Sequence, residues 1–171
     1  MGVYVMIKLK GYEEIFVQQQ NNLTGCIPAS IEWMMRFKNI QLPDDFQTKF
    51  DLEVQGKDKN NYETISSAIN KDKDFSKIKF EFIKNFPSGE KKYEYIENKI
   101  SKQIPVCISI FELLIGGFHS VPVVEIDERS VFVLTLNGYN IEQQKRRYPR
   151  GGLIWAYKNI NGGQDTLAIL D

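Results

Sequence analysis

The sequence predicts a single α+β domain, because helical patterns dominate its first half and strand patterns its second half. Apolar residues recur three or four positions apart in several segments before residue 105. After residue 105, short apolar runs alternate with turn residues, which is typical of strands. With 171 residues, of which 42% are hydrophobic, the chain is long enough for one substantial core. We therefore expect one domain over residues 1–171.

A polar loop over residues 14–25, rich in Gln and Asn, leads into a helix predicted from Cys26 to about Lys38. Pro28 is tolerated in the first turn of a helix, where its missing N–H costs nothing. The apolar residues of this segment recur at helical spacing: Ile31, Met34 and Met35. This helix is the most apolar one available to cover the expected sheet, and packing it there would bring Cys26 to the edge of the sheet.

The remaining elements follow from the same periodicities. Apolar stripes predict helices over 61–71 and 91–102, and strict alternation predicts a half-buried strand over 75–86. Pro122 argues for an edge position or a bulge in its strand. Further strands are expected over 3–9, 105–111, 120–126, 131–137 and 153–159, and loops over 41–60 and 138–152.

The composition argues against several classes of partner. Lys and Arg together number 22, as do Asp and Glu, so net charge gives no reason to expect nucleic acid or an anionic membrane. No apolar run is long enough for a signal peptide or a membrane span, so we expect a cytoplasmic protein. One histidine and two distant cysteines do not match the usual zinc spacings, and no cofactor or metal is expected. A bridge between Cys26 and Cys107 stays open, although two free thiols are the simpler expectation.

Cys26 lies where the positive end of the helix dipole and unpaired N–H groups point outward. This position favours the thiolate, which is the nucleophilic form of cysteine. A small buried thiol that serves packing alone is the alternative reading of such a residue. Cys107, in an apolar strand, is expected to belong to the core.

The single histidine, His119, opens the strand expected over 120–126, and a turn leads from there to the strand expected over 131–137. With a three-residue turn, His119 faces Asn137; with a four-residue turn it faces Gly138, and Asn137 lies diagonal to it. Opposed side chains have Cβ atoms roughly 4.5–5.5 Å apart, so Asn137 can reach the imidazole in both cases. An amide oxygen that accepts from one ring nitrogen fixes the tautomer and directs the other nitrogen outward.

A thiol, a base and an orienting residue together form the apparatus of cysteine nucleophilic catalysis. Gln20 would complete it, because its side-chain NH2 and the Cys26 backbone N–H could both stabilise an oxyanion. Gln18 and Gln19 stand beside Gln20, and a solvated loop residue is the alternative reading for all three.

These residues resemble papain-like cysteine peptidases, and within them the peptidase C39-like group. The likeness rests on the spacing from Gln20 to Cys26, the Pro-Ala pair in CIPAS, and the run from PVCISI through HSVPVVEID to VFVLTLNG. It covers roughly 14–40 and 90–140, and the segment at about 41–89 is expected to be a variable insertion. The resemblance implies a papain-like fold, in which an N-terminal helix carrying the cysteine packs on a C-terminal antiparallel sheet.

The resemblance also implies roles: Cys26 as nucleophile, His119 as general base, Asn137 as orienting residue and Gln20 as oxyanion donor. The expected activity is that of a thiol hydrolase, acting on a peptide or protein substrate through an acyl-enzyme. Two alternatives stay open: an acyltransferase that uses the same site, and a non-catalytic binding module. The second follows from departures from the group's pattern, which usually has Gly where this chain has Ile27, commonly Asp where it has Gly25, and usually Asp as the orienting residue.

Overall fold

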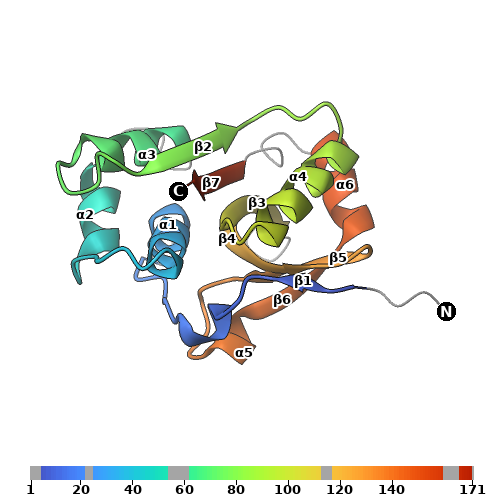
Figure 1. The fold of residues 1–171 in the computed structure, drawn as a ribbon, viewed down its shortest axis with the longest axis horizontal. Coiled ribbons are helices and arrows are strands. Elements are labelled where there is room, and N and C mark those ends of the chain that lie inside the picture. Colours follow the sequence, from blue (N-terminus) through green and yellow to red (C-terminus); the bar gives the residue numbers. More distant parts are fainter. Residues whose placement is uncertain (1–4, 22–24, 54–61, 113–116, 160–165, 171) are drawn as a thin grey trace.

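The computed structural model describes residues 5–21, 25–53, 62–112, 117–159 and 166–170 (Figure 1). A short 3-10 helix, η1 (Tyr12–Glu14), precedes the α-helices. The helices are α1 (Cys26–Phe37), α2 (Phe46–Glu53), α3 (Tyr62–Lys71), α4 (Gly89–Ser101), α5 (Ile141–Gln144) and α6 (Arg150–Asn159). The strands are β1 (Ile7–Lys8), β2 (Lys79–Ile83), β3 (Val106–Glu112), β4 (Gly117–Ile126), β5 (Ser130–Leu134), β6 (Lys145–Pro149) and β7 (Thr166–Leu170).

The described strands form one antiparallel sheet with the order β2-β7-β3-β4-β5-β6, and β1 pairs with β4. The strand β7, at the end of the chain, therefore lies between β2 from the first half and β3 from the second. Helices precede most of the strands along the chain, which confirms the predicted α+β class.

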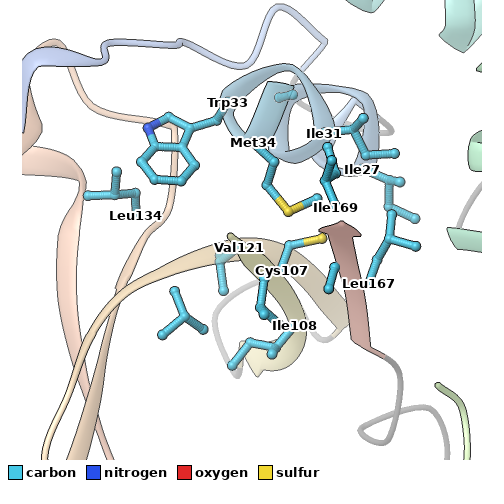
Figure 2. Close-up of a cluster of buried hydrophobic side chains, with 14 of the residues drawn as sticks. Ile27, Ile31, Trp33, Met34, Cys107, Ile108, Val121, Leu134, Leu167 and Ile169 are labelled. Atoms are coloured by element: carbon cyan, nitrogen blue, oxygen red, sulfur yellow. The ribbon is translucent and has the colours of Figure 1, made fainter. Parts of the chain in front are cut away.

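Helix α1 packs on this sheet through its apolar face. Every residue from Ile27 to Met35 is buried, and Figure 2 shows Ile31 and Met34 above the side chains of β3 and β7. The sulfur of Cys107 points toward Met34 in this cluster, and Leu167 and Ile169 of β7 border it. The predicted arrangement, a cysteine-bearing helix on an antiparallel sheet, is confirmed.

Two of the predicted helices also form as the periodicity indicated. The helix predicted over 61–71 is α3, which buries Tyr62, Ile65 and Ile69. The helix predicted over 91–102 is α4, which begins two residues earlier because Ser88 caps it by accepting a hydrogen bond from the Lys91 N–H. None of the helices in the described segments is long and apolar enough to cross a membrane.

The strand predicted over 153–159 is wrong, because this segment belongs to helix α6. A short apolar run fits a buried strand and a buried helix equally well by pattern, so packing decides. Helix α6 contacts α4, and the two approach closely at Gly89, where an added Cβ would lie 3.0 Å from the Cα of Ile154. The absence of a side chain at Gly89 permits this contact.

The loops expected over 41–60 and 138–152 are corrected in part. Helix α2 buries Phe46 and Phe50, a pair one turn apart that is too short a pattern to predict a helix. The basic segment Lys145–Pro149 is strand β6, at the edge of the sheet, where charged residues and proline are common. Residues 54–60 lie outside the described residues. The segment 41–89 contributes α2, α3 and β2, and its origin as an insertion stays a prediction.

Several strand bounds differ from the predicted ones. The alternating run over 75–86 forms a strand only over Lys79–Ile83, and β5 ends at Leu134 instead of residue 137. Of the strand expected over 3–9, residues 3 and 4 lie outside the described residues, and within 5–9 a strand forms over Ile7–Lys8. The strand Thr166–Leu170 was not predicted, although its sequence, TLAIL, is mostly apolar and its first four residues are buried.

The β4–β5 hairpin combines both predicted registers. Ile126 pairs with Val131, as a four-residue turn requires, and a register shift next to Val124 then pairs Val123 with Val133, as a three-residue turn would. The strand β4 is an interior strand, so the edge position considered for Pro122 is wrong, whereas a bulge does follow it closely. Pairing with β5 stops at Val123, and Pro122 pairs only with Cys107 of β3.

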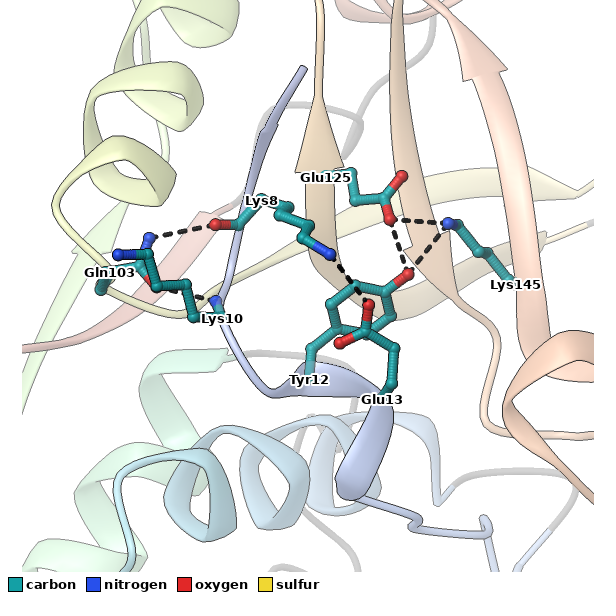
Figure 3. Close-up of polar contacts among 7 residues, drawn as sticks. All are labelled: Lys8, Lys10, Tyr12, Glu13, Gln103, Glu125 and Lys145. Carbon is teal, nitrogen blue, oxygen red and sulfur yellow. Dashed lines mark hydrogen bonds and ion pairs between the residues drawn. The ribbon is translucent and has the colours of Figure 1, made fainter.

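A buried polar cluster ties the N-terminal segment to the sheet (Figure 3). The Tyr12 hydroxyl donates to Glu125 Oε1 over 2.6 Å, and Lys145 Nζ donates to the same oxygen over 2.7 Å. Lys145 Nζ also lies 2.9 Å from the Tyr12 hydroxyl oxygen. Only 8% of Glu125 is exposed, so its carboxylate depends on these two donors. The cluster therefore joins η1 to β4 and β6.

Candidate active site

Cys26 is the first residue of α1 and is half-buried. The first turn of the helix contains no acidic residue that would offset the positive end of its dipole. Gly25 precedes it, and the Gly25 N–H donates to the Asn21 carbonyl over 2.9 Å. A Cβ at Gly25 would lie 2.8 Å from that same oxygen, so a side chain here would displace the loop. The departure at Gly25 from the pattern of the resembled group thus has a steric reason.

His119 lies in β4 and is 4% exposed. Its Nε2 is 2.8 Å from the main-chain carbonyl oxygen of Thr135. Because a carbonyl oxygen only accepts, Nε2 carries the proton, and in the neutral ring Nδ1 holds the lone pair. Asn137 is exposed, and its side chain has no hydrogen-bond partner among the described residues. Its role as orienting residue stays a prediction.

Helix α1 and strand β4 are joined beside these two residues. The Ser30 hydroxyl donates to the Ser120 carbonyl over 3.0 Å, and both residues are buried. Ser30 lies one helical turn after Cys26, a rise of roughly 5–6 Å, and Ser120 directly follows His119. The structure thus brings the start of α1 next to the start of β4, although no hydrogen bond links Cys26 to His119 among the described residues.

Side chains on β4 alternate between the two faces of the sheet, and Ser120 faces α3. Its hydroxyl lies 2.8 Å from that of Tyr62, which is fully buried. Burial raises the pKa of the Cys107 thiol to about 12. Burial, and to a lesser degree the Cys107 and Cys26 thiolates, also hold the pKa of Tyr62 well above its usual value. Cys107 is thus a core residue, as expected, and Cys26 is the more accessible thiol.

The three neighbouring glutamines differ in their surroundings. The Gln18 carbonyl accepts from Gln47 Nε2 over 2.9 Å. Gln19 is buried, and its Nε2 donates to the Asn21 carbonyl over 2.6 Å. Gln20 is exposed, and its Oε1 accepts from Thr48 Oγ1 over 3.2 Å, which leaves its NH2 free to donate to another group. Among the three, Gln20 combines exposure with a position at the mouth of α1.

A groove runs along α1 from its first residue toward its last. At the mouth, Gln20, Gly25 and Gln47 border a cavity of about 250 Å³. An adjoining cavity of about 500 Å³ shares Gln20 and Gln47 with it and extends to Phe16 and Arg36. A third cavity of about 310 Å³ continues from Phe16 and Arg36 to the turn after the helix. We call these three cavities together the α1 groove.

Two residues that the sequence did not indicate, Gln47 and Thr135, also contribute to the candidate site. Gln47 of α2 bonds Glu32 of α1 over 2.7 Å and so fixes one wall of the α1 groove. Thr135 was missed because its contribution is a main-chain carbonyl, which no side-chain pattern announces. Among the described residues, no group of three His, Cys, Asp or Glu side chains could hold a metal ion.

No family model matches the chain, and no curated protein matches it. Among solved structures, the chain is similar to the crystal structure of a "putative C39-like peptidase" from Bacillus anthracis, with a TM-score of 0.66. The match covers 98% of this chain and 98% of that chain, at 14% sequence identity. Such a likeness concerns the fold, so the chain has the α+β fold of a C39-like peptidase, as the sequence resemblance implied.

Proposed function

We propose that this protein is a thiol hydrolase that cleaves peptide or amide bonds through an acyl-enzyme on Cys26. His119 acts as general base, and Gln20 is an oxyanion donor. The observation that carries the proposal is the buried hydrogen bond from Ser30 to Ser120, which fixes the start of the cysteine helix beside the start of the histidine strand. The fold shared with a C39-like peptidase supports the same reading.

Cys26 is the proposed nucleophile because it is the more accessible of the two thiols and stands at the start of a helix. Cys26 is the first residue of α1, where N–H groups and the positive end of the helix dipole are exposed. Cys107 is fully buried in an apolar strand, and its pKa of about 12 keeps it protonated at neutral pH. A half-buried Cys26 is open to reagents from which Cys107 is shielded.

The proposed reaction uses Cys26, His119 and Gln20 in turn. The Cys26 sulfur attacks the substrate carbonyl carbon, its proton passes to His119 Nδ1, and the carbonyl oxygen becomes an oxyanion. The Cys26 N–H and the Gln20 side-chain NH2 donate to that oxyanion. When the C–N bond breaks, the imidazolium gives its proton to the leaving amine, and a thioester remains. His119 then takes a proton from water, whose oxygen attacks the thioester, and the carboxylate product and free thiol are released.

The α1 groove supports an extended polypeptide as substrate. It begins at Gln20 and Gly25, the residue before Cys26, and continues along a helix of 12 residues. Such a helix is about 18 Å long, which matches about five residues of extended chain.

The proposal is tested by turnover on a fluorogenic peptide library together with alkylation by iodoacetamide. We expect Cys26→Ala to lower turnover at least about 10³-fold, because the nucleophile is lost, without a change in melting temperature that explains the loss. Cys107→Ala is the matched control, and it should retain turnover after correction for stability. In the wild type, Cys26 should be alkylated faster than Cys107, and this reactivity should shrink in His119→Ala.

Three outcomes would contradict the proposal: near-normal turnover in Cys26→Ala, near-normal turnover in His119→Ala, or alkylation of Cys26 no faster than that of Cys107. In each case a non-catalytic module with the same fold becomes the better description.

A further inference from the structure

The described hydrogen bond of the His119 ring goes to the main-chain carbonyl of Thr135, and the Thr135 N–H and hydroxyl both donate to the carbonyl oxygen of a buried glutamine, Gln144. We infer that the Thr135 carbonyl oxygen orients the His119 ring and that Gln144, acting through Thr135, is a positioning residue of the site. The inference rests on the proposed function, since the orientation of the ring affects catalysis only if His119 is the base.

The His119 ring contacts the main chain of Thr135. Nε2 lies 2.8 Å from the carbonyl oxygen, and both residues are more than nine-tenths buried. Burial strengthens this hydrogen bond, because water cannot replace the acceptor. The ring is therefore held in the Nε2–H tautomer, in which Nδ1 is the basic nitrogen.

Thr135 is in turn hydrogen-bonded to Gln144. The Thr135 N–H donates to the Gln144 carbonyl over 2.9 Å, and the Thr135 hydroxyl donates to the same oxygen over 3.2 Å. Two donors from one residue to one acceptor fix the direction of the Thr135 backbone. Its carbonyl therefore has little freedom to turn away from His119.

A strained turn directly follows Thr135. Leu136 has a φ of 59°, in the left-handed region that a leucine rarely adopts. The Leu136 carbonyl accepts from the Gln19 N–H over 2.9 Å, and Leu136 is fully buried. Such strain persists only where the surroundings hold it, and here it turns the chain out of β5 beside the candidate base.

The Gln144 side chain holds the same turn from behind. It is fully buried, and its Nε2 donates to the carbonyl oxygens of Val17 and Gly138, each over 2.9 Å. Its Oε1 has no hydrogen-bond partner among the described residues. A buried unpaired oxygen is costly, so an apolar side chain would serve packing better. The amide is explained if its two donated bonds hold the 135–138 turn in place behind His119.

This arrangement supplies the orienting acceptor without a side chain. Asn137, which the hairpin register suggested, is exposed and makes no hydrogen bond to a described residue. Thr135 lies two residues earlier, where the backbone itself reaches the ring. Asn137 is thus the competing candidate, and the experiment separates the two.

The experiment is NMR of the imidazole nitrogens, which is direct because the protein has a single histidine. In the wild type at about pH 8, we expect the Nε2–H tautomer, with a slowly exchanging ring proton. Gln144→Met keeps the size of the side chain but removes both donated bonds, and it should give a tautomer mixture and faster exchange. Thr135→Val, which removes only the hydroxyl bond, should shift both in the same direction by less. Gln143→Met, at an exposed neighbouring glutamine, is the matched control.

Kinetics on a peptide that the wild type cleaves supply the second readout. Gln144→Met should lower kcat/KM about 10- to 100-fold, mostly through kcat, because its main effect is to misalign the base. The inference is overturned if the wild-type ring carries its proton on Nδ1. It is also overturned if Asn137→Ala shifts the tautomer and Gln144→Met and Thr135→Val do not. A ring that behaves as expected in a protein without turnover would contradict the hydrolase proposal alone.

Discussion

Replacing Lys145 by Met tests the buried cluster that ties the N-terminal segment to the sheet (Figure 3). Lys145 Nζ donates to Glu125 Oε1 and to the Tyr12 hydroxyl oxygen, and it lies 5.5 Å above the centre of the Tyr12 ring. Methionine keeps most of the aliphatic stem but removes the charge and both donors. Glu125 would then keep a single donor, Tyr12, in a site that is almost closed to water.

The expected cost follows from the strength of a hydrogen bond to a charged group, about 1.5–3 kcal/mol. The Lys145 side chain is 30% exposed, so water can partly replace it, and the lower half of that range applies. We expect a loss of about 2 kcal/mol in the free energy of unfolding. For a protein of this size, that lowers the melting temperature by about 4–8 °C.

The assay is urea unfolding of the wild type, Lys145→Met, Tyr12→Phe and the double variant. Tyr12 and Lys145 share one acceptor oxygen, so their effects should not add, and the double-mutant cycle should give a coupling energy above about 0.5 kcal/mol. Lys8→Met is the control, because its pair with Glu13 is about half exposed on both sides and should contribute about 0–1 kcal/mol. A loss in Lys145→Met no larger than in Lys8→Met, or additive effects in the cycle, would refute the reasoning.

Two further predictions concern β2 and β7. Burial alone would raise the pKa of Glu81, but hydrogen bonds from Lys99 and Tyr95 lower it below its ordinary value. The ionised Glu81 therefore stabilises the fold above the unfolded pKa of about 4.5. This stability is lost as the pH falls through the lower pKa of the folded protein. The stability gap between wild type and Glu81→Gln should therefore be larger at about pH 6 than at about pH 3 in urea unfolding, and an equal gap would exclude this linkage. Leu167→Ala should lower the free energy of unfolding by about 2–5 kcal/mol, because Leu167 is fully buried under α1 between β2 and β3. Leu170 is partly exposed, so Leu170→Ala should lower it clearly less. Equal losses in the two variants would argue against this position of β7.

Local sequence determined the elements whose signal repeats over several turns or strand residues. The helix that begins at Cys26 and the one that begins at Gly89 formed within two residues of the predicted starts, because apolar stripes and N-terminal signals agree there. The strand that contains His119 and the strand that follows it also formed, because alternation and turn residues mark them. The residues proposed as nucleophile and base were therefore available from the sequence alone.

Tertiary structure decided the features whose local signal is ambiguous or absent. Residues 153–159 form a helix because Gly89 lets α4 approach them, and the pattern of that segment fits a strand equally well. The strand Thr166–Leu170 takes its place between β2 and β3 through pairings that join distant parts of the chain. The acceptor for His119 is a main-chain oxygen of Thr135, and backbone atoms are the same in every residue. Which of them meets the ring depends on a strained turn and on a buried glutamine, neither of which a side-chain pattern encodes.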